Sequence, residues 1–149
     1  MITVGPLVAT DRPVWTELFT GYNEFYGRTP SVALLDGAWR EVTIGDRIHA
    51  LGARLDERLV GITHFFTHPS TTSADVCYLQ DLFTAEAARG RGVARSLIEA
   101  VADWAREQGC ARVYWHTKAD NHTARRLYDR VAEDRGFIQY VLPLEQRPD

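Results

Sequence analysis

The residues best suited to chemistry form one short segment rich in glycine and arginine, residues 89–95, which reads Arg-Gly-Arg-Gly-Val-Ala-Arg. Glycine allows a tight turn, and because it has no Cβ a ligand can approach the backbone. A helix that begins within this segment points its first N–H groups and the positive end of its dipole at one place. Such a place binds pyrophosphate, and arginine adds charge that does not titrate away. The segment therefore predicts a pyrophosphate site.

Two other nucleotide-binding patterns do not fit this segment. The dinucleotide-binding fingerprint requires three glycines, and Arg95 stands where the third would be. The Walker loop requires Gly-Lys followed by Ser or Thr, which the sequence lacks. A glycine-rich turn that merely joins a strand to a helix is the structural alternative, and the segment taken by itself leaves that alternative open.

The segment also resembles motif A of the GNAT superfamily of acyl-CoA N-acyltransferases, which reads Gln or Arg, two residues, Gly, one residue, and Gly or Ala. Arg89, Gly92 and Ala94 match this pattern. A second stretch, residues 121–137, resembles motif B, in which Asn is followed by Leu-Tyr and later by Gly-Phe. The resemblance covers nearly the whole chain and is most specific over residues 76–137.

This resemblance implies that acetyl-CoA is the cosubstrate. In the family, the motif A loop holds the pyrophosphate, an exposed edge of the central strand pairs with the amides of the pantetheine arm, and an Asn binds that arm. The residues that carry these roles here are Leu82, Phe83, Thr84, Arg89, Gly90, Arg91, Gly92, Val93, Ala94, Arg95 and Asn121.

The resemblance makes Tyr128 the general acid, because in the family this Tyr donates a proton to the departing CoA thiolate. Tyr128 follows Asn121 by seven residues, so the two side chains share one face of a helix. An ordinary core aromatic is the alternative for Tyr128. For Asn121 the alternative is a helix N-cap, and both roles could hold at once.

Direct attack of a neutral amine on a thioester requires a base, and Asp81 is the first candidate. It lies in the predicted central strand, where successive side chains alternate between the two faces of the sheet. The side chain of Asp81 is therefore on the opposite face from those of Gln80 and Leu82. A backbone N–H at Leu82 or its neighbour would hold the oxyanion. Diamine-type relatives read Leu-Glu-Asp here, and Gln80 stands in place of their Glu. The reserve candidates for the base are Glu24, His64 and His116, for which a solvated charge and hydrogen-bonded strand histidines are the alternatives.

The acceptor pocket of the family lies between the first two helices, the meander and the central strand. Aromatic side chains with one or two acids suit an amine with an apolar body, although core packing claims several of them. The residues expected to line the pocket are Tyr22, Glu24, Tyr26, Phe66, Gln80 and Trp115, with Phe25 and Phe65 also available.

Hydrophobic periodicity and turn residues predict the elements that must position these side chains. Strands are expected at residues 2–9, 47–55, 59–67, 76–84, 111–117 and 137–144, and helices near residues 11–26, 31–43, 91–108 and 120–136. The predicted fold is α/β (α+β), a mixed and mostly antiparallel sheet of six or so strands in the order βααβββαβαβ, with helices on both faces. Residues 1–149 are expected to form one domain.

Composition excludes several classes of protein. The 149 residues carry 17 Lys plus Arg against 20 Asp plus Glu, for a formal net charge of −3, which argues against a nucleic-acid or membrane-surface binder. Cys77 and Cys110 stand alone, and the N-terminus lacks the features of a signal peptide, so we expect a cytoplasmic protein. The histidines form no metal-ligand pattern, because His64 and His68, four residues apart, fall in a predicted strand and at its end, so no metal is expected.

The predicted function is therefore transfer of an acetyl group from acetyl-CoA to a primary amine of a small molecule, a polyamine or a protein. The alternative is a module of the same fold that binds acyl-CoA without turnover, as a sensor or an interaction domain. A homodimer is a further possibility, because an exposed final strand could support one.

Overall fold

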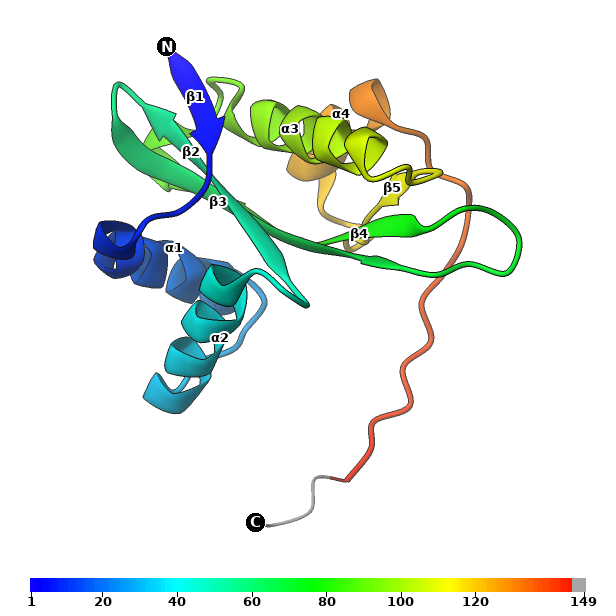
Figure 1. The fold of residues 1–149 in the computed structure, drawn as a ribbon, viewed down its shortest axis with the longest axis horizontal. Coiled ribbons are helices and arrows are strands. Elements are labelled where there is room, and N and C mark those ends of the chain that lie inside the picture. The colour runs from blue at the N-terminus through cyan, green and yellow to red at the C-terminus, as the bar shows by residue number, and fades with distance from the viewer. Residues whose placement is uncertain (146–149) are drawn as a thin grey trace. The chain divides into compact units, whose positions relative to one another are not determined.

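The structure is a computed structural model that describes residues 1–145. The chain divides into two compact units, the first formed by Met1–His116 and the second beginning at Thr117. The first unit contains a five-stranded sheet in the order β1-β2-β3-β4-β5 (Figure 1). Its strands are β1 (Ile2–Gly5), β2 (His49–Leu55), β3 (Arg58–His68), β4 (Val76–Thr84) and β5 (Val113–Tyr114). Neighbouring strands run antiparallel except for β4 and β5, which run parallel.

Helices cover both faces of this sheet, as predicted. Two helices, α1 (Arg12–Phe25) and α2 (Val32–Ile44), lie against one face, and α3 (Val93–Glu107) lies against the other (Figure 1). Short 3-10 turns at Ala9–Asp11 and Glu86–Ala88 precede α1 and the loop before α3. The second unit contains α4 (His122–Val131).

The start and the end of α2 follow from its sequence. The Ser31 hydroxyl accepts a hydrogen bond from the N–H of Leu34 at 3.1 Å, which satisfies one of the first free donors of the helix. The helix ends at Gly45, whose φ of +68° is a left-handed conformation that glycine adopts without steric cost.

The core of the first unit lies on both faces of the sheet. Under α1 and α2 the buried side chains are Trp15, Leu18, Phe19, Trp39, Val42, Leu59 and Ile62. Under α3 they are Ala53, Ala88, Val93 and Leu97. Helix α3 approaches β3 closely at Gly61, where a Cβ would lie 2.7 Å from Cγ1 of Val93. Glycine at this position therefore allows the Val93 side chain to pack directly on the backbone of β3.

The predicted final strand, residues 137–144, is wrong. Residues 132–145 form no helix or strand, and their apolar side chains are exposed, with Phe137 at 90% and Tyr140 at 89%. A strand requires a neighbour that pairs with its backbone, and the alternation of apolar residues by itself does not supply one. Pro143 also lacks an N–H to donate. The predicted strand at 111–117 is likewise reduced to β5, so the sheet has five strands among the described residues.

An ion pair ties the entry of α1 to β2 and makes the stability of the fold depend on pH. The Asp11 carboxylate accepts hydrogen bonds from both Nη atoms of Arg54, at 2.9 and 2.6 Å, and from the Val8 N–H at 2.8 Å. The Arg54 hydrogen bonds lower the pKa of Asp11, against an opposing effect of burial. Because the folded state lowers this pKa, the pair stabilises the fold above the ordinary carboxyl range, and the stabilisation is lost as the pH falls through the lowered pKa.

Arg54→Met should therefore lower the free energy of unfolding at neutral pH by about 1–3 kcal/mol, because it leaves a buried carboxylate without its main partner. Denaturant titrations at about pH 7 and about pH 3 should show the difference from wild type shrinking at the lower pH. The matched control is Arg47→Met, which removes the Arg47–Glu41 surface pair and should change stability far less. A difference for Arg54→Met that is equally large at both pH values would contradict the assignment.

Candidate functional site

The central strand β4 has one fully paired edge and one edge that is mostly open. It pairs with β3 along its whole length, whereas β5 pairs with it only at Cys77 and Tyr78. Along residues 79–84, no strand within the described part of the chain occupies the second edge. The backbone N–H and C=O groups of such an edge can pair with an extended ligand that carries amides. The three strand residues predicted to bind the cofactor lie in this part of β4.

A β-bulge interrupts β4 next to the open edge. Asp81 lies opposite His64 and Leu79 lies opposite Phe65, so Gln80 is an extra residue with no partner of its own on β3. Such a bulge bends the strand and changes the direction in which the neighbouring side chains point.

Because of the bulge, Tyr78 and Asp81 face the same side of the sheet. The Tyr78 ring contacts the Phe66 ring, with centroids 5.5 Å apart, and Phe66 shares a face of β3 with His64, which is bonded to Asp81. Simple alternation places Tyr78 and Asp81 on opposite faces. Tyr78 could not be selected from the sequence, because no residue type in the segment indicates a β-bulge.

The loop after β4 leads into α3, whose N-terminus has no side-chain cap. Gly90 and Gly92 have φ values of +79° and +85°, in the left-handed region that favours glycine, and α3 begins directly afterwards at Val93. No side chain caps this start, so the first N–H groups of the helix are available to an anion. A Cβ at either glycine would meet nothing within 4 Å, so the backbone conformation, not lack of space, requires glycine there.

The three arginines of the loop differ in their surroundings. Arg89 donates from Nε to the last carbonyl of β4 at 3.3 Å, and its guanidinium lies 5.5 Å from the centroid of the Phe83 ring. Arg95 donates from Nε to Glu99 at 3.0 Å on the exposed side of α3. Arg91 is exposed. The loop thus fixes Arg89 beside the open edge of β4, and Glu99 already neutralises part of the Arg95 charge.

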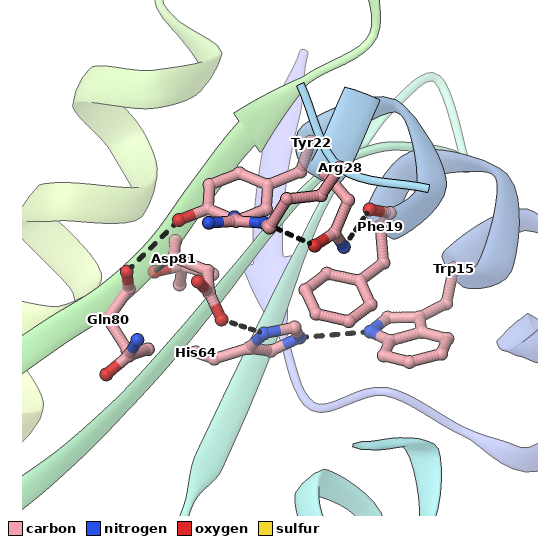
Figure 2. A network of polar contacts seen from close by, with 9 residues as sticks. Trp15, Phe19, Tyr22, Arg28, His64, Gln80 and Asp81 are labelled. Atoms are coloured by element: carbon pink, nitrogen blue, oxygen red, sulfur yellow. Dashed lines mark hydrogen bonds and ion pairs between the residues drawn. The ribbon is translucent and has the colours of Figure 1, made fainter. Parts of the chain in front are cut away.

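A buried chain of polar contacts leads from α1 to β4 (Figure 2). The Trp15 indole N–H lies 3.0 Å from Nε2 of His64, and Nδ1 of His64 lies 2.9 Å from Oδ2 of Asp81. Trp15 is fully buried, His64 is 2% exposed, and the side chain of Asp81 is 13% exposed. The Asp81 carboxylate is therefore the end of this chain that a ligand can reach.

Three tyrosines lie near enough to Asp81 to be affected by its charge. The Tyr22 hydroxyl donates to the Gln80 carbonyl at 3.4 Å (Figure 2). Burial, followed by the negative charge of Asp81, raises the pKa of Tyr22. The pKa values of Tyr26 and Tyr78 are also raised, mainly by burial and with a smaller effect of Asp81. All three phenols therefore stay protonated at neutral pH and can donate hydrogen bonds.

A cation lies over two of these rings. The Arg28 guanidinium is 5.8 Å from the Tyr22 ring centroid and 5.4 Å from that of Tyr26. Its Nε donates to the side-chain carbonyl of Asn23 at 3.1 Å, and the Asn23 amide donates in turn to the Phe19 carbonyl at 2.8 Å. The sequence reasoning did not include Arg28, although it follows the aromatic residues of α1 directly.

The remaining residues predicted for the acceptor pocket differ in position. Glu24 and Phe25 are exposed on α1, with Phe25 at 59%. Phe65 was predicted as a possible lining residue, and this is wrong: it is 1% exposed and packs edge-on against Trp104 of α3, on the opposite face of the sheet. Trp115 is half-buried directly after β5.

His116, a reserve candidate for the base, also follows β5. Its Nδ1 lies 3.2 Å from the Tyr78 hydroxyl, so the two side chains share a hydrogen bond. His64, the other reserve histidine, is held between Trp15 and Asp81, as described above.

The second unit contains the residues predicted from motif B. Asn121 precedes α4, but its side chain forms no cap; its amide donates instead to the Thr117 hydroxyl at 3.0 Å. Tyr128 lies on α4 and is half-buried. Arg125 donates to the Ala119 carbonyl at 2.6 Å, which holds the entry of the helix.

Other kinds of site find little support in residues 1–145. No three His, Cys, Asp or Glu side chains there gather closely enough to hold a metal ion. Burial raises the pKa of Cys77 to about 12, so this thiol is not a thiolate nucleophile at neutral pH. Among the described helices, none combines the length and apolar character of a membrane span.

Comparison with known proteins places this geometry in a family. Residues 13–132 match the acetyltransferase (GNAT) family. The D-amino-acid N-acetyltransferase HPA3 of Saccharomyces cerevisiae is 42% identical over 82 residues, which span 54% of this chain and 51% of the yeast protein. The uncharacterized N-acetyltransferase YhfO of Bacillus subtilis is 27% identical over 136 residues, which span 89% of this chain and 91% of YhfO.

A solved structure shows the same fold. The aminoglycoside N-acetyltransferase AAC(6')-Iy, in complex with the bisubstrate analogue CoA-S-monomethyl-acetylneamine, has a TM-score of 0.80 at 20% identity and covers 99% of each chain. The family match extends over most of the chain and includes both the start of α3 and all of α4. These findings confirm the resemblance inferred from the two motifs: the chain belongs to the acetyltransferase (GNAT) family.

Proposed function

We propose that this protein transfers the acetyl group of acetyl-CoA to a primary amine. The observation that carries the proposal is the combination of the open edge of β4 with the uncapped start of α3, joined by a loop of a few residues. One surface pairs with amides and the other binds pyrophosphate, which are the two parts of the pantetheine–nucleotide arm of CoA. The named relatives are N-acetyltransferases, which favours turnover over a non-catalytic acyl-CoA module.

The residues that would hold acetyl-CoA follow from this geometry. The N–H groups at the start of α3, together with Arg89 and Arg91, bind the pyrophosphate, and residues 82–84 of β4 pair with the pantetheine amides. The side-chain amide of Asn121 also binds the pantetheine arm. The known structure with a CoA-based analogue supports this assignment through its fold.

The chemical step divides among three groups. Asp81 accepts a proton from the attacking amine, directly or through one water, while the amine nitrogen forms its bond to the thioester carbon. The backbone N–H of Leu82 or its neighbour donates to the oxygen on which negative charge develops. Tyr128 donates its phenolic proton to the sulfur as the carbon–sulfur bond breaks. The acetylated amine and the CoA thiol leave, and the proton held by Asp81 returns Tyr128 to its starting state through solvent.

The acceptor would be an amine with an apolar or aromatic body. Tyr22, Tyr26 and Phe66 supply ring faces, and the phenols of Tyr22 and Tyr26 and the carboxylate of Asp81 supply polar contacts for an amino group. Relatives are named for D-amino acids, aminoglycosides and thialysine, so the test requires representatives of each of these classes. The remaining residues proposed to line the pocket are Glu24, Gln80 and Trp115.

A thiol-release assay tests the proposed function. The purified protein is mixed with acetyl-CoA and a panel of amines that includes D- and L-amino acids, diamines, an aminoglycoside and arylalkylamines. We expect release of CoA with at least one amine, with the acetylated amine identified by mass spectrometry. Tight binding of acetyl-CoA without release of CoA for any amine would support the non-catalytic alternative.

Removing the arginines of the α3 loop should mainly weaken the binding of acetyl-CoA. Arg89→Ala with Arg91→Ala should raise the Kd by about 10- to 100-fold, because two charge-assisted contacts to the pyrophosphate are lost. Isothermal titration with acetyl-CoA and with dephosphorylated pantetheine fragments measures the effect. The control is Arg40→Ala with Arg106→Ala, which removes two exposed arginines elsewhere and should leave the Kd within about twofold. An unchanged Kd for the loop variant refutes the pyrophosphate assignment.

We also propose that residues 1–149 work as one acetyltransferase domain in the cytoplasm. The family match runs across the boundary between the two compact units, which supports one functional domain. Cys77 and Cys110 are both free, as is usual in a reducing compartment. The net charge of −3 supports a small amine or a protein, and not a nucleic acid, as partner.

A homodimer is proposed for a separate reason. Six apolar side chains between Phe137 and Leu144 are exposed by 70% or more, an unusual concentration for a monomer. A second copy of the chain would cover them. Sedimentation at several protein concentrations tests this proposal.

A further inference from the structure

We propose that Trp15 and His64 form a positioning pair that holds the Asp81 carboxylate ready to accept a proton, with His64 fixed as a neutral imidazole that is not itself the base. The inference rests on the proposed function, which assigns Asp81 as the proton acceptor and therefore requires its carboxylate to have a fixed position. The sequence did not single out Trp15, and it offered His64 either as a reserve base or as a hydrogen-bonded strand histidine.

The geometry of the pair defines the position of each proton. An indole N–H can only donate, so the 3.0 Å contact requires Nε2 of His64 to offer its lone pair. In a neutral imidazole the proton must then lie on Nδ1, which donates to Oδ2 of Asp81 at 2.9 Å. Asp81 accepts this bond as a carboxylate. A second proton on His64 would point an N–H at the N–H of Trp15, so the indole disfavours the imidazolium.

Packing prevents the pair from rearranging. The Trp15 ring stacks on Phe19 at 5.1 Å and contacts Trp39 at 5.1 Å, while Phe19 meets His64 edge-on at 5.2 Å. With Trp15 fully buried and His64 2% exposed, neither ring has room to turn toward solvent. The site thus supplies two features that a proton acceptor requires, a fixed direction and a fixed protonation state.

The backbone of Asp81 is held as well. Its carbonyl accepts a hydrogen bond from the Thr63 hydroxyl at 2.8 Å, so main chain and side chain are each tied to β3. These contacts lie immediately after the Gln80 bulge, where a strand would otherwise have freedom to twist. The pair and Thr63 together keep the carboxylate in place.

The charged and titratable groups that face this pair come from several elements. Helix α1 contributes Tyr22 and Tyr26, the segment after it contributes Arg28, and β4 contributes Tyr78. The pKa values of the three tyrosines are raised, so they remain neutral, and Arg28 remains cationic. Helix α2 contributes Trp39, which does not titrate. His116 lies beside Tyr78, so the signals of the two imidazoles must be assigned separately in any measurement of protonation in this region.

Two substitutions separate the contribution of each ring. Trp15→Phe keeps an aromatic ring but removes the indole donor, so His64 becomes free to take a second proton. The acidic limb of the pH profile of kcat/KM should then move up toward the range in which an ordinary imidazole titrates, about pH 6.5, with activity near pH 8 within about threefold of wild type. His64→Asn keeps a donor near the position of Nδ1 and should retain activity to within about tenfold, whereas His64→Leu should lower kcat by about 10- to 100-fold at unchanged acetyl-CoA Kd.

The control for packing is Phe19→Leu, which alters a ring that touches both members of the pair. It should reduce thermal stability about as much as Trp15→Phe does, but it should leave the acidic limb in place because the indole donor remains. A shift of the limb in Phe19→Leu as large as that in Trp15→Phe would overturn the proposal. So would equal activities of His64→Leu and His64→Asn.

The deciding measurement does not depend on turnover. Nitrogen-15 NMR of histidine-labelled full-length protein, recorded between about pH 5 and pH 8, should show His64 as the neutral Nδ1–H form throughout in wild type, and as the doubly protonated form on acidification in Trp15→Phe. If wild-type His64 carries its proton on Nε2 or becomes doubly protonated near pH 6.5, the positioning pair is refuted, even if the protein proves to be an active acetyltransferase. If the amine panel gives no turnover but the NMR result is as expected, the proposed function is refuted and the hydrogen-bonded pair itself is upheld.

Discussion

Asp81→Asn should lower kcat by about 10²- to 10⁴-fold, the range expected when a general base is removed. The amide keeps an oxygen that can accept the hydrogen bond from His64, so the local geometry should persist while the proton acceptor is lost. The rate of the variant should rise steadily with pH, because solvent hydroxide must then take the proton that Asp81 accepts during the attack. Steady-state thiol release from pH 6 to about pH 10 measures both effects.

The control for this variant is Asp103→Asn, which removes an exposed carboxylate from the surface of α3 and should leave kcat unchanged. The acetyl-CoA Kd of Asp81→Asn should stay within about twofold of wild type, since the carboxylate is assigned to the amine and not to the cosubstrate. A kcat close to that of wild type would show that another group or water alone accepts the proton.

Tyr128→Phe should lower kcat by about 10²- to 10³-fold while the acetyl-CoA Kd stays nearly constant. The substitution removes only the hydroxyl, so the CoA thiolate must leave without a proton donor. Single-turnover measurements with acetyl-CoA in excess separate the chemical step from product release.

Tyr140→Phe is a matched control, because it removes the hydroxyl from a tyrosine of the second unit that is 89% exposed. It should behave as wild type in the same assays. Equal losses of kcat and of acetyl-CoA affinity in Tyr128→Phe would mean that Tyr128 supports the fold of its helix and does not take part in proton transfer.

Local patterns predicted much of the fold because local physics determines those elements. Gly90 and Gly92 marked the turn before α3, and in the structure both adopt positive φ directly before the helix starts. The hairpin of β2 and β3 and the long central strand also lie close to their predicted bounds. The prediction of a final strand at 137–144 failed because strand formation depends on a distant partner, which alternation of side chains does not reveal.

The arrangement of the site could be predicted only in part. Asp81 and the aromatic residues of α1 were singled out by residue type. The bulge at Gln80 was not, and it is the bulge that places Tyr78 on the same face as Asp81. The contact between Trp15 and His64 joins residues 49 positions apart, and no local pattern links an indole on a helix to an imidazole on a strand. Such long-range contacts depend on how the helices pack on the sheet, and this packing cannot be predicted from local patterns in one sequence.

The close approach at Gly61 gives the molecule a fixed internal spacing. Because Gly61 has no side chain, the Val93 side chain packs directly on the backbone of β3, and a single β-branched residue with little rotamer freedom separates the helix start from the strand. The anchoring point for the cosubstrate and the strand that carries His64 are therefore held at one separation. Substitutions intended to change the acceptor amine should therefore leave this contact unchanged. They should be made in α1 and α2, which pack on the sheet through large side chains that can be replaced by smaller ones.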